Sequence, residues 1–359
     1  MQIPVLIGCG LIDILNKCYE DFLKIDLETE IGHLLKHKQA EKIVGIWNLW
    51  SRISFPRFET YVWQCVNRAN RLQEVIDITG TVHTAINLLY VLSHHGLCQV
   101  SQNGDIVFSK KLKNDEVAVD CANAVIPERI KNKREHGQFQ ATWSTSVKRA
   151  NMIFEQIPPW KHIFFCGDDD LTSLALGQMS SSACNISVGD IDRDLISFIK
   201  DYSGRHGLQI EAFEFDVKYE APDQYKKKYD VFHCDPLDHG QGIDLWLQRA
   251  QEVLKGEPGD AIYLNISADR LGQREHYLFK HLHEMGFDLE EKYKNFSSYQ
   301  VAEEPFLNTE KLNEEMNKIN IGYDTIKDLY IHTDLYVFIR KSVRPIFLPQ
   351  EFMEIRRKI

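Results

Sequence analysis

The segment Ile163-Phe164-Phe165-Cys166, followed by Gly167-Asp168-Asp169-Asp170, decides the fold class that we predict for this chain. Its four apolar residues are typical of a buried strand, and the apolar run over residues 171–176 continues as a helix. In doubly wound α/β sheets the turn after such a strand faces the ligand crevice, where glycines usually let backbone N–H groups approach an anion. Three consecutive carboxylates instead repel an anion and attract a cation. The segment therefore predicts a Rossmann-like α/β fold with a site for an amine.

Strand-like runs alternate with helix-like runs after this segment, which indicates βαβ units and a mainly parallel sheet. The further strands are expected at residues 185–188, 210–215, 229–234, 261–265, 287–294 and 335–340. Between the last two we expect an acidic, partly helical insertion over residues 296–328.

The first 115 residues are mostly helix-like. Residues 72–80 predict a short helix ended by glycine, and residues 82–94 predict a second helix. Residues 99–108 predict two strands around the turn Asn103-Gly104. Helix, helix and hairpin follow in the order of a winged helix. Because the second helix has no dense stripe of Lys and Arg, a dimerisation or site-covering role is favoured over DNA binding.

The length, composition and charge of the chain limit the classes of protein to which it can belong. With 359 residues, 43% hydrophobic and 26% charged, the chain is long enough for two globular domains. The expected divisions are 1–115 (helical, winged-helix-like), 116–160 (bridging segment), 161–345 (Rossmann-like catalytic domain) and 346–359 (tail). The net charge of −10 argues against binding nucleic acid through its phosphates.

Cysteine usage and hydropathy bear on location. The eight cysteines include no C-x-x-C pair, which is typical of reduced thiols and favours a cytoplasmic protein. The N-terminus has no basic leader, and no apolar run approaches the roughly 18 residues of a spanning helix. We therefore expect neither secretion nor membrane attachment.

Acidic residues follow the ends of four expected strands. Because ligands bind outside the carboxyl ends of strands in open α/β sheets, these acids predict one site for a cationic ligand. They are Asp168, Asp169 and Asp170 after the first strand, Asp190 and Asp192 after the second, Asp216 after the third, and Asp235 and Asp238 after the fourth.

The acids are expected to take different roles. An acid after the second strand typically accepts hydrogen bonds from ribose hydroxyls, which assigns Asp190 or Asp192 to a nucleoside donor. Asp216 is expected near an adenine edge, and Gly167 also belongs to the donor site. The open alternative for the acids is that each caps the helix that follows.

A polyamine acceptor is protonated at neutral pH, with amine pKa values of about 10, so the attacking nitrogen must first lose a proton. Asp235 is the leading candidate for this step, followed by Asp170 or Asp169, although Asp235-Pro236 is also a common turn. Other residues are expected to bind the substrate or line its channel, with core packing as the alternative for the aromatic ones. These are Asp168, Asp238, His239, Tyr299 and Trp143.

The loop over residues 167–170 also indicates which form of the donor the site accepts. S-adenosylmethionine carries an α-carboxylate, which glycine-rich loops accommodate, whereas decarboxylated S-adenosylmethionine keeps only the aminopropyl amine. An aspartate-rich loop favours the decarboxylated donor. No metal is expected, because His281 and His283 are two positions apart and would lie on different faces of a helix.

At these motifs the chain resembles the branched-chain polyamine synthases, over about residues 70–340. The resemblance implies transfer of an aminopropyl group from decarboxylated S-adenosylmethionine to spermidine. It also implies that the triple-aspartate loop binds the reacting amines and supplies the catalytic carboxylate, and that the protein is a homodimer. It rests on Gly167-Asp168-Asp169-Asp170-Leu171, Asp190-Ile191-Asp192, Asp235-Pro236, Asn295-Phe296-Ser297-Ser298-Tyr299, and Gln140, Thr142, Thr145 and Lys148-Arg149-Ala150 of the bridge.

Two departures from the family pattern concern the acceptor and a metal. The family usually has a second proline where this chain has Leu237, followed by Asp238 and His239, which leaves the acceptor's shape open. Only Cys121 stands where archaeal members tend to carry a cysteine pair, so no zinc site is supported. Two other functions remain as alternatives: an S-adenosylmethionine-dependent amine methyltransferase or aminocarboxypropyltransferase, and a polyamine-sensing DNA-binding regulator.

Overall fold

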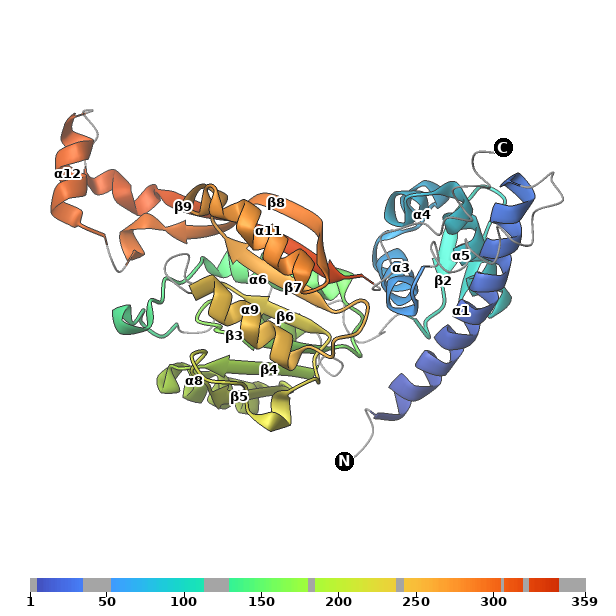
Figure 1. Cartoon of the computed structure of the whole chain (residues 1–359), viewed down its shortest axis with the longest axis horizontal. Helices are drawn as coiled ribbons and strands as arrows, with labels where there is room; N and C mark the ends of the chain where they lie inside the picture. The colour runs from blue at the N-terminus through green and yellow to red at the C-terminus, as the bar shows by residue number, and fades with distance from the viewer. Residues whose placement is uncertain are drawn as a thin grey trace. The chain divides into compact units, whose positions relative to one another are not determined.

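The structure is a computed structural model that describes residues 5–34, 53–112, 129–179, 185–236, 242–304, 307–318 and 323–341 (Figure 1). These residues fall into two compact units. The first contains residues 5–112 and 155–158 of the described chain, and the second contains residues 129–154 and 159–341.

The first unit is helical with one small hairpin. Gly80, with a φ of +82°, ends the first of the two predicted helices at the expected residue. Thr81 caps the next helix by accepting a hydrogen bond from the Thr84 backbone N–H. The predicted helices and hairpin are thus confirmed, whereas the winged-helix interpretation stays a prediction. The elements are α1 (Val5–Leu34), α3 (Phe55–Arg68), α4 (Leu72–Thr79), α5 (Val82–His94), β1 (Cys98–Val100) and β2 (Ile106–Phe108).

Within the described segments, no single helix is long and apolar enough to cross a membrane. Helices α4 and α5, which are bent relative to each other, reach the length and hydropathy of a membrane span only when the two are counted together.

The second unit is built on a seven-stranded sheet with the order β5-β4-β3-β6-β7-β9-β8 in its described part. Strands β3 to β7 are parallel, and β9 runs antiparallel to its neighbours β7 and β8. This arrangement confirms the Rossmann-like α/β class. The strands are β3 (His162–Cys166), β4 (Asn185–Asp190), β5 (Ile210–Glu214), β6 (Val231–Cys234), β7 (Ala261–Ile266), β8 (Phe287–Gln300) and β9 (Tyr330–Arg340).

Helices cover the sheet on both faces. Buried side chains of α9 and α11 join one hydrophobic cluster with Phe164, Phe232 and Ile262 of the central strands, so these two helices lie on the same face. On α8, Asp192 caps the first turn and Gly207, with a φ of +67°, follows the last. The helices are η2 (Arg134–His136), α6 (Trp143–Gln156), α7 (Thr172–Met179), α8 (Arg193–His206), η3 (Asp223–Tyr225), α9 (Gly242–Val253), α10 (Ala268–Leu271) and α11 (Arg274–Glu284).

The last two strands are longer than the sequence predicts. Strand β8 continues to Gln300 and β9 begins at Tyr330, so the predicted insertion over residues 296–328 begins too early. The ladder shifts register between Tyr293 and Ser297, and Asn295 has a φ of +50°, which interrupts the alternation of a strand. The shorter connection contains η4 (Val301–Glu303), α12 (Thr309–Lys318) and η5 (Tyr323–Asp328).

Candidate active site

The turn after β3 begins with a glycine in the left-handed region. Gly167 has a φ of +78°, and its backbone N–H donates to the Gly189 carbonyl at 2.9 Å. Asp168 then accepts hydrogen bonds from the backbone N–H of Ser173 at 3.2 and 3.4 Å, in the first turn of α7. Burial raises the pKa of Asp168 to about 8. The first aspartate of the run is therefore a buried helix cap.

The next two aspartates have opposite surroundings. Asp169 is half-buried and has no hydrogen bond or ion pair with another described residue. Burial, together with the negative charges of Asp170, Asp190, Asp235 and Asp168, raises its pKa well above the ordinary range. Asp170, in contrast, is buried and accepts hydrogen bonds from the Ala141 backbone N–H and from Arg149. Asp169 is thus the member of the run left to meet a ligand.

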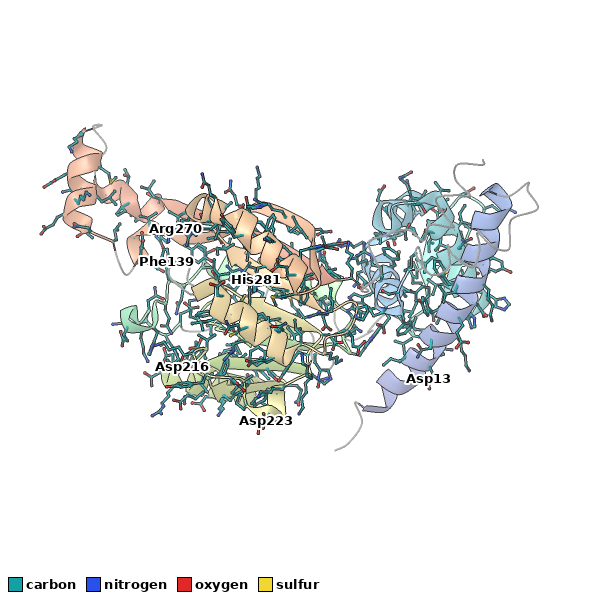
Figure 2. The ribbon with its side chains drawn as sticks, in the orientation of Figure 1. Asp13, Phe139, Asp216, Asp223, Arg270 and His281 are labelled. Carbon is teal, nitrogen blue, oxygen red and sulfur yellow. The ribbon has the colours of Figure 1, made fainter. Side chains whose placement is uncertain are left out.

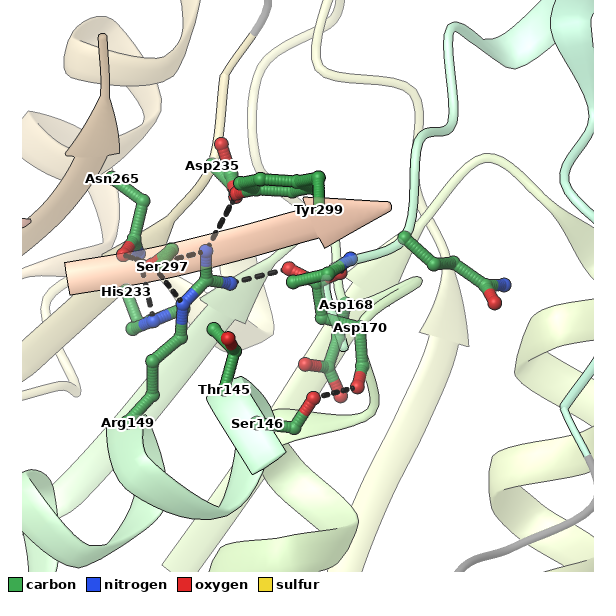
Figure 3. A network of polar contacts seen from close by, with 12 residues as sticks. Thr145, Ser146, Arg149, Asp168, Asp170, His233, Asp235, Asn265, Ser297 and Tyr299 are labelled. Atoms are coloured by element: carbon green, nitrogen blue, oxygen red, sulfur yellow. Dashed lines mark hydrogen bonds and ion pairs between the residues drawn. The ribbon is translucent and has the colours of Figure 1, made fainter. Parts of the chain in front are cut away.

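One guanidinium joins the acids from two strand ends (Figure 3). The side chain of Arg149, on α6, is 1% exposed and pairs with Asp170 after β3 and with Asp235 after β6, at 2.8 Å from the second. The hydroxyl of Tyr299 accepts a hydrogen bond from Arg149 at 2.7 Å and donates one to Asp235. Burial raises the pKa of Asp235 to about 6, against the opposing effects of Arg149 and Tyr299.

A second layer of polar side chains supports the guanidinium. The hydroxyl of Ser297 accepts hydrogen bonds from Nε and Nη2 of Arg149, at 3.0 and 2.9 Å, and donates to Asn265 Oδ1 at 3.1 Å. Asn265 Nδ2 lies 3.1 Å from His233 Nε2 and 3.3 Å from the Cys234 carbonyl. Burial and then the charge of Arg149 hold the pKa of His233 well below its usual range, so this imidazole is neutral.

The acids after β4 have separate surroundings. Asp190 accepts hydrogen bonds from the backbone N–H groups of Asp168 and Asp192, at 3.2 and 2.8 Å, and burial raises its pKa. Asp192 caps α8 and is also bound by Lys133 and by Gln138, at 2.5 and 2.9 Å. Burial opposes its ionisation, but the hydrogen bonds from Lys133 and Gln138 lower its pKa overall. Asp192 is thereby already neutralised by the protein.

Two further predicted residues, Asp216 and Trp143, are half-buried. Asp216 follows β5 and accepts a hydrogen bond from the Lys218 backbone N–H at 2.9 Å. Trp143 is the first residue of α6. The ring of Phe139 lies 5.2 Å from that of Tyr299, and Figure 2 shows Phe139 and Asp216 on the same side of the second unit. Asp238 and His239 lie outside the described residues.

Several residues of this centre were not singled out as site residues from the sequence: Arg149, Ser297, Asn265, Lys133 and Gln138. For Arg149 and Ser297 the only signal was their place in motifs of the resembled family. Among the described residues, no three His, Cys, Asp or Glu side chains are arranged to hold a metal ion.

A family model described as the branched-chain polyamine synthase A C-terminal domain matches residues 119–333, which contain every side chain of this centre. The chain belongs to the branched-chain polyamine synthase family. The match begins at residue 119, so helices α1, α3, α4 and α5 lie outside it.

Curated relatives agree with membership of the branched-chain polyamine synthase family. An N(4)-bis(aminopropyl)spermidine synthase of Thermococcus kodakarensis is 36% identical over 145 residues, which are 39% of this chain and 40% of that protein. An uncharacterised protein of Methanocaldococcus jannaschii is 35% identical over 195 residues, which are 53% of this chain and 48% of that protein. The chain thus matches about half or less of these relatives' length.

A solved structure of the family has the same fold. The branched-chain polyamine synthase of Thermus thermophilus, in complex with N4-aminopropylspermidine and 5′-methylthioadenosine, superposes with a TM-score of 0.50 at 15% identity. The superposition covers 90% of this chain and 94% of that one.

Proposed function

We propose that this chain is an aminopropyltransferase that moves an aminopropyl group from decarboxylated S-adenosylmethionine to a nitrogen of a polyamine such as spermidine, giving a branched polyamine. The observation that carries the proposal is the carboxyl of Asp169, which has no hydrogen bond or ion pair within the part of the chain that the structure describes and is under the electrostatic influence of Asp170, Asp190 and Asp235. Relatives named N(4)-bis(aminopropyl)spermidine synthase and the Thermus complex with a polyamine and methylthioadenosine support the same reaction.

The reaction joins an amine nitrogen to a carbon activated by a sulfonium. The nitrogen's lone pair attacks the methylene carbon next to sulfur, the carbon–sulfur bond breaks, and its electron pair leaves with sulfur as neutral methylthioadenosine. The acceptor nitrogen must give up a proton in the process. We assign this step to the carboxyl of Asp169, whose pKa is raised by burial and by its acidic neighbours, with Asp235 and Asp170 as the other candidates.

Donor binding is assigned to the tips of β4 and β5. Asp190 receives the ribose hydroxyls, because Asp192 is occupied by Lys133, Gln138 and the first turn of α8. Asp216 stands near the adenine edge, and Gly167 lines the donor at the turn. The α-carboxylate of S-adenosylmethionine would approach the negative charge of the Asp169 loop, which favours the decarboxylated donor.

The test combines the purified chain with spermidine and one donor at a time, followed by mass spectrometry. Decarboxylated S-adenosylmethionine should give methylthioadenosine and a polyamine heavier by one or more aminopropyl groups. Release of S-adenosylhomocysteine from S-adenosylmethionine would instead identify a methyltransferase. Asp169→Asn should lower turnover at least about a hundredfold with an unchanged melting temperature, and Asp201→Asn, on the exposed face of α8, is the matched control.

We also propose that the protein is a cytoplasmic homodimer whose partner is a small polyamine rather than a nucleic acid. Buried free thiols at Cys18, Cys65, Cys98, Cys166 and Cys234 support a reducing compartment. Light scattering of the full chain measures the oligomeric state, and binding of a duplex DNA probe in moderate salt would contradict the second claim.

A further inference from the structure

We propose that Arg149 is a positioning residue that acts as a built-in counter-ion: its guanidinium occupies Asp170 and Asp235, so that a substrate ammonium is directed to Asp169. This inference rests on the proposed amine-binding function. It assigns different tasks to Asp169, Asp170 and Asp235, which the sequence offers as candidates for the same proton step.

The geometry leaves the guanidinium no freedom. Nη1 pairs with Asp170, Nη2 pairs with Asp235, and Nε donates to Ser297, so every nitrogen has an acceptor (Figure 3). With its side chain 1% exposed, Arg149 cannot turn toward solvent without leaving two carboxylates unpaired. A planar, always charged fork is the group best suited to hold two carboxylates at once.

The support for this cation comes from strands β7 and β8. Ser297 accepts from Arg149 and donates to Asn265, and Asn265 in turn contacts the carbonyl of Cys234, the residue before Asp235. Neither Ser297 nor Asn265 has a carboxylate or ammonium to offer a ligand. Ser297 and Asn265 therefore hold the guanidinium of Arg149 at a fixed position relative to the carboxyl end of β6.

The consequence concerns where an ammonium can bind. Removing Arg149 would leave the buried Asp170 and the half-buried Asp235 without their cation, and each would then take up a proton or bind a substrate ammonium instead. An amine held there would pair with Asp170 and Asp235 instead of with Asp169. Arg149 thus excludes a competing position for the acceptor.

Chemical rescue separates this role from a purely structural one. Arg149→Ala should lower kcat with spermidine and decarboxylated S-adenosylmethionine roughly a hundredfold, comparable with the loss of one preorganised charge–dipole contact. Millimolar guanidinium chloride should restore at least about a tenth of the lost activity, because it replaces the missing fork. Urea, which has the same shape without the charge, should restore none. Arg193→Ala, which removes an exposed arginine of the same unit, is the matched control and should keep wild-type activity with and without guanidinium.

A second readout needs no turnover. Millimolar guanidinium should raise the melting temperature of Arg149→Ala and leave that of the wild type unchanged or lower it. If guanidinium stabilises Arg149→Ala but the wild type transfers no aminopropyl group, the proposed function is wrong and the role of Arg149 as a counter-ion still holds. Equal rescue by urea and guanidinium, or activity of Arg149→Ala within about threefold of wild type, would overturn the inference itself. If Arg149→Ala does not fold, Ser297→Ala keeps the charge and removes its support, and an unchanged kcat in that variant also contradicts the proposal.

Discussion

Lys133 Nζ lies 2.5 Å from Asp192 Oδ1, although 59 positions separate the two residues in sequence. Gln138 contacts the other oxygen of the same carboxylate at 2.9 Å. The pairing ties the segment before α6 to the start of α8. It distinguishes Asp192 from Asp190, whose carboxyl accepts hydrogen bonds from two backbone N–H groups of the described chain and from none of its side chains.

We expect Asp190→Asn and Asp192→Asn to differ in donor binding. Asp190→Asn should weaken the affinity for methylthioadenosine about tenfold to a hundredfold, because a hydrogen bond to a charged group is lost. Asp192→Asn should leave this affinity within about threefold and lower the free energy of unfolding by about 1–3 kcal/mol, since Lys133 loses its buried partner. Calorimetry and urea unfolding measure the two effects. Equal loss of affinity in both variants would contradict the assignment of the ribose to Asp190.

Protonation of Asp235 should add an acid limb of its own to the activity profile, separate from the titration of Asp169, the proposed base. The pKa of about 6 for Asp235 means that, as the pH falls below this value, the carboxyl becomes protonated and no longer pairs as an anion with Arg149. We expect kcat/KM to fall about tenfold per pH unit well below the limb. Tyr299→Phe removes a hydrogen bond that lowers the pKa of Asp235, so the limb should move to higher pH. Tyr293→Phe, on the same strand, should leave it in place.

Asp168 should make stability depend on pH. In the folded protein its pKa is about 8, whereas in the unfolded chain it is about 4. Between these values the folded state holds a proton that the unfolded state has released, so the free energy of unfolding falls as the pH rises, by at most about 1.4 kcal/mol per unit. Asp168→Asn keeps a helix-capping oxygen and cannot ionise. Its stability relative to wild type should therefore increase from about pH 5 to about pH 8 in urea unfolding, and a constant difference would contradict the burial of this carboxyl.

Replacing Gly167 or Gly204 with alanine should change the free energy of unfolding in opposite directions. Gly167 has a φ of +78°, so Gly167→Ala should lower the free energy of unfolding by about 1–2 kcal/mol. Gly204 lies on the exposed face of α8 with no atom within 4 Å of an added Cβ, so Gly204→Ala should raise it by up to about 1 kcal/mol. Thermal unfolding compares both with wild type, and stabilisation by Gly167→Ala would contradict the strained turn.

The sequence predicts the sheet well where apolar runs mark buried strands, as at Ile163 to Cys166. It fails at the end of β8, because Asn295 and the register shift before Ser297 hide a strand among polar residues. The gathering of acids at the strand tips follows from the general topology of parallel sheets. The sequence does not predict which of these acids are paired with a cation. Arg149 is 86 positions from Asp235 and 148 from Ser297, and no local sequence pattern indicates contacts over such separations.

The three aspartates of the run have different surroundings. The first accepts hydrogen bonds from the first turn of α7, the third pairs with Arg149, and the middle one has no hydrogen bond or ion pair with another described residue. Among the described residues of this run, the middle aspartate makes the fewest polar contacts with the scaffold. In evolution, a shift of this loop toward a different amine, or toward no charge preference at all, would thus pass most easily through a single codon, that of Asp169.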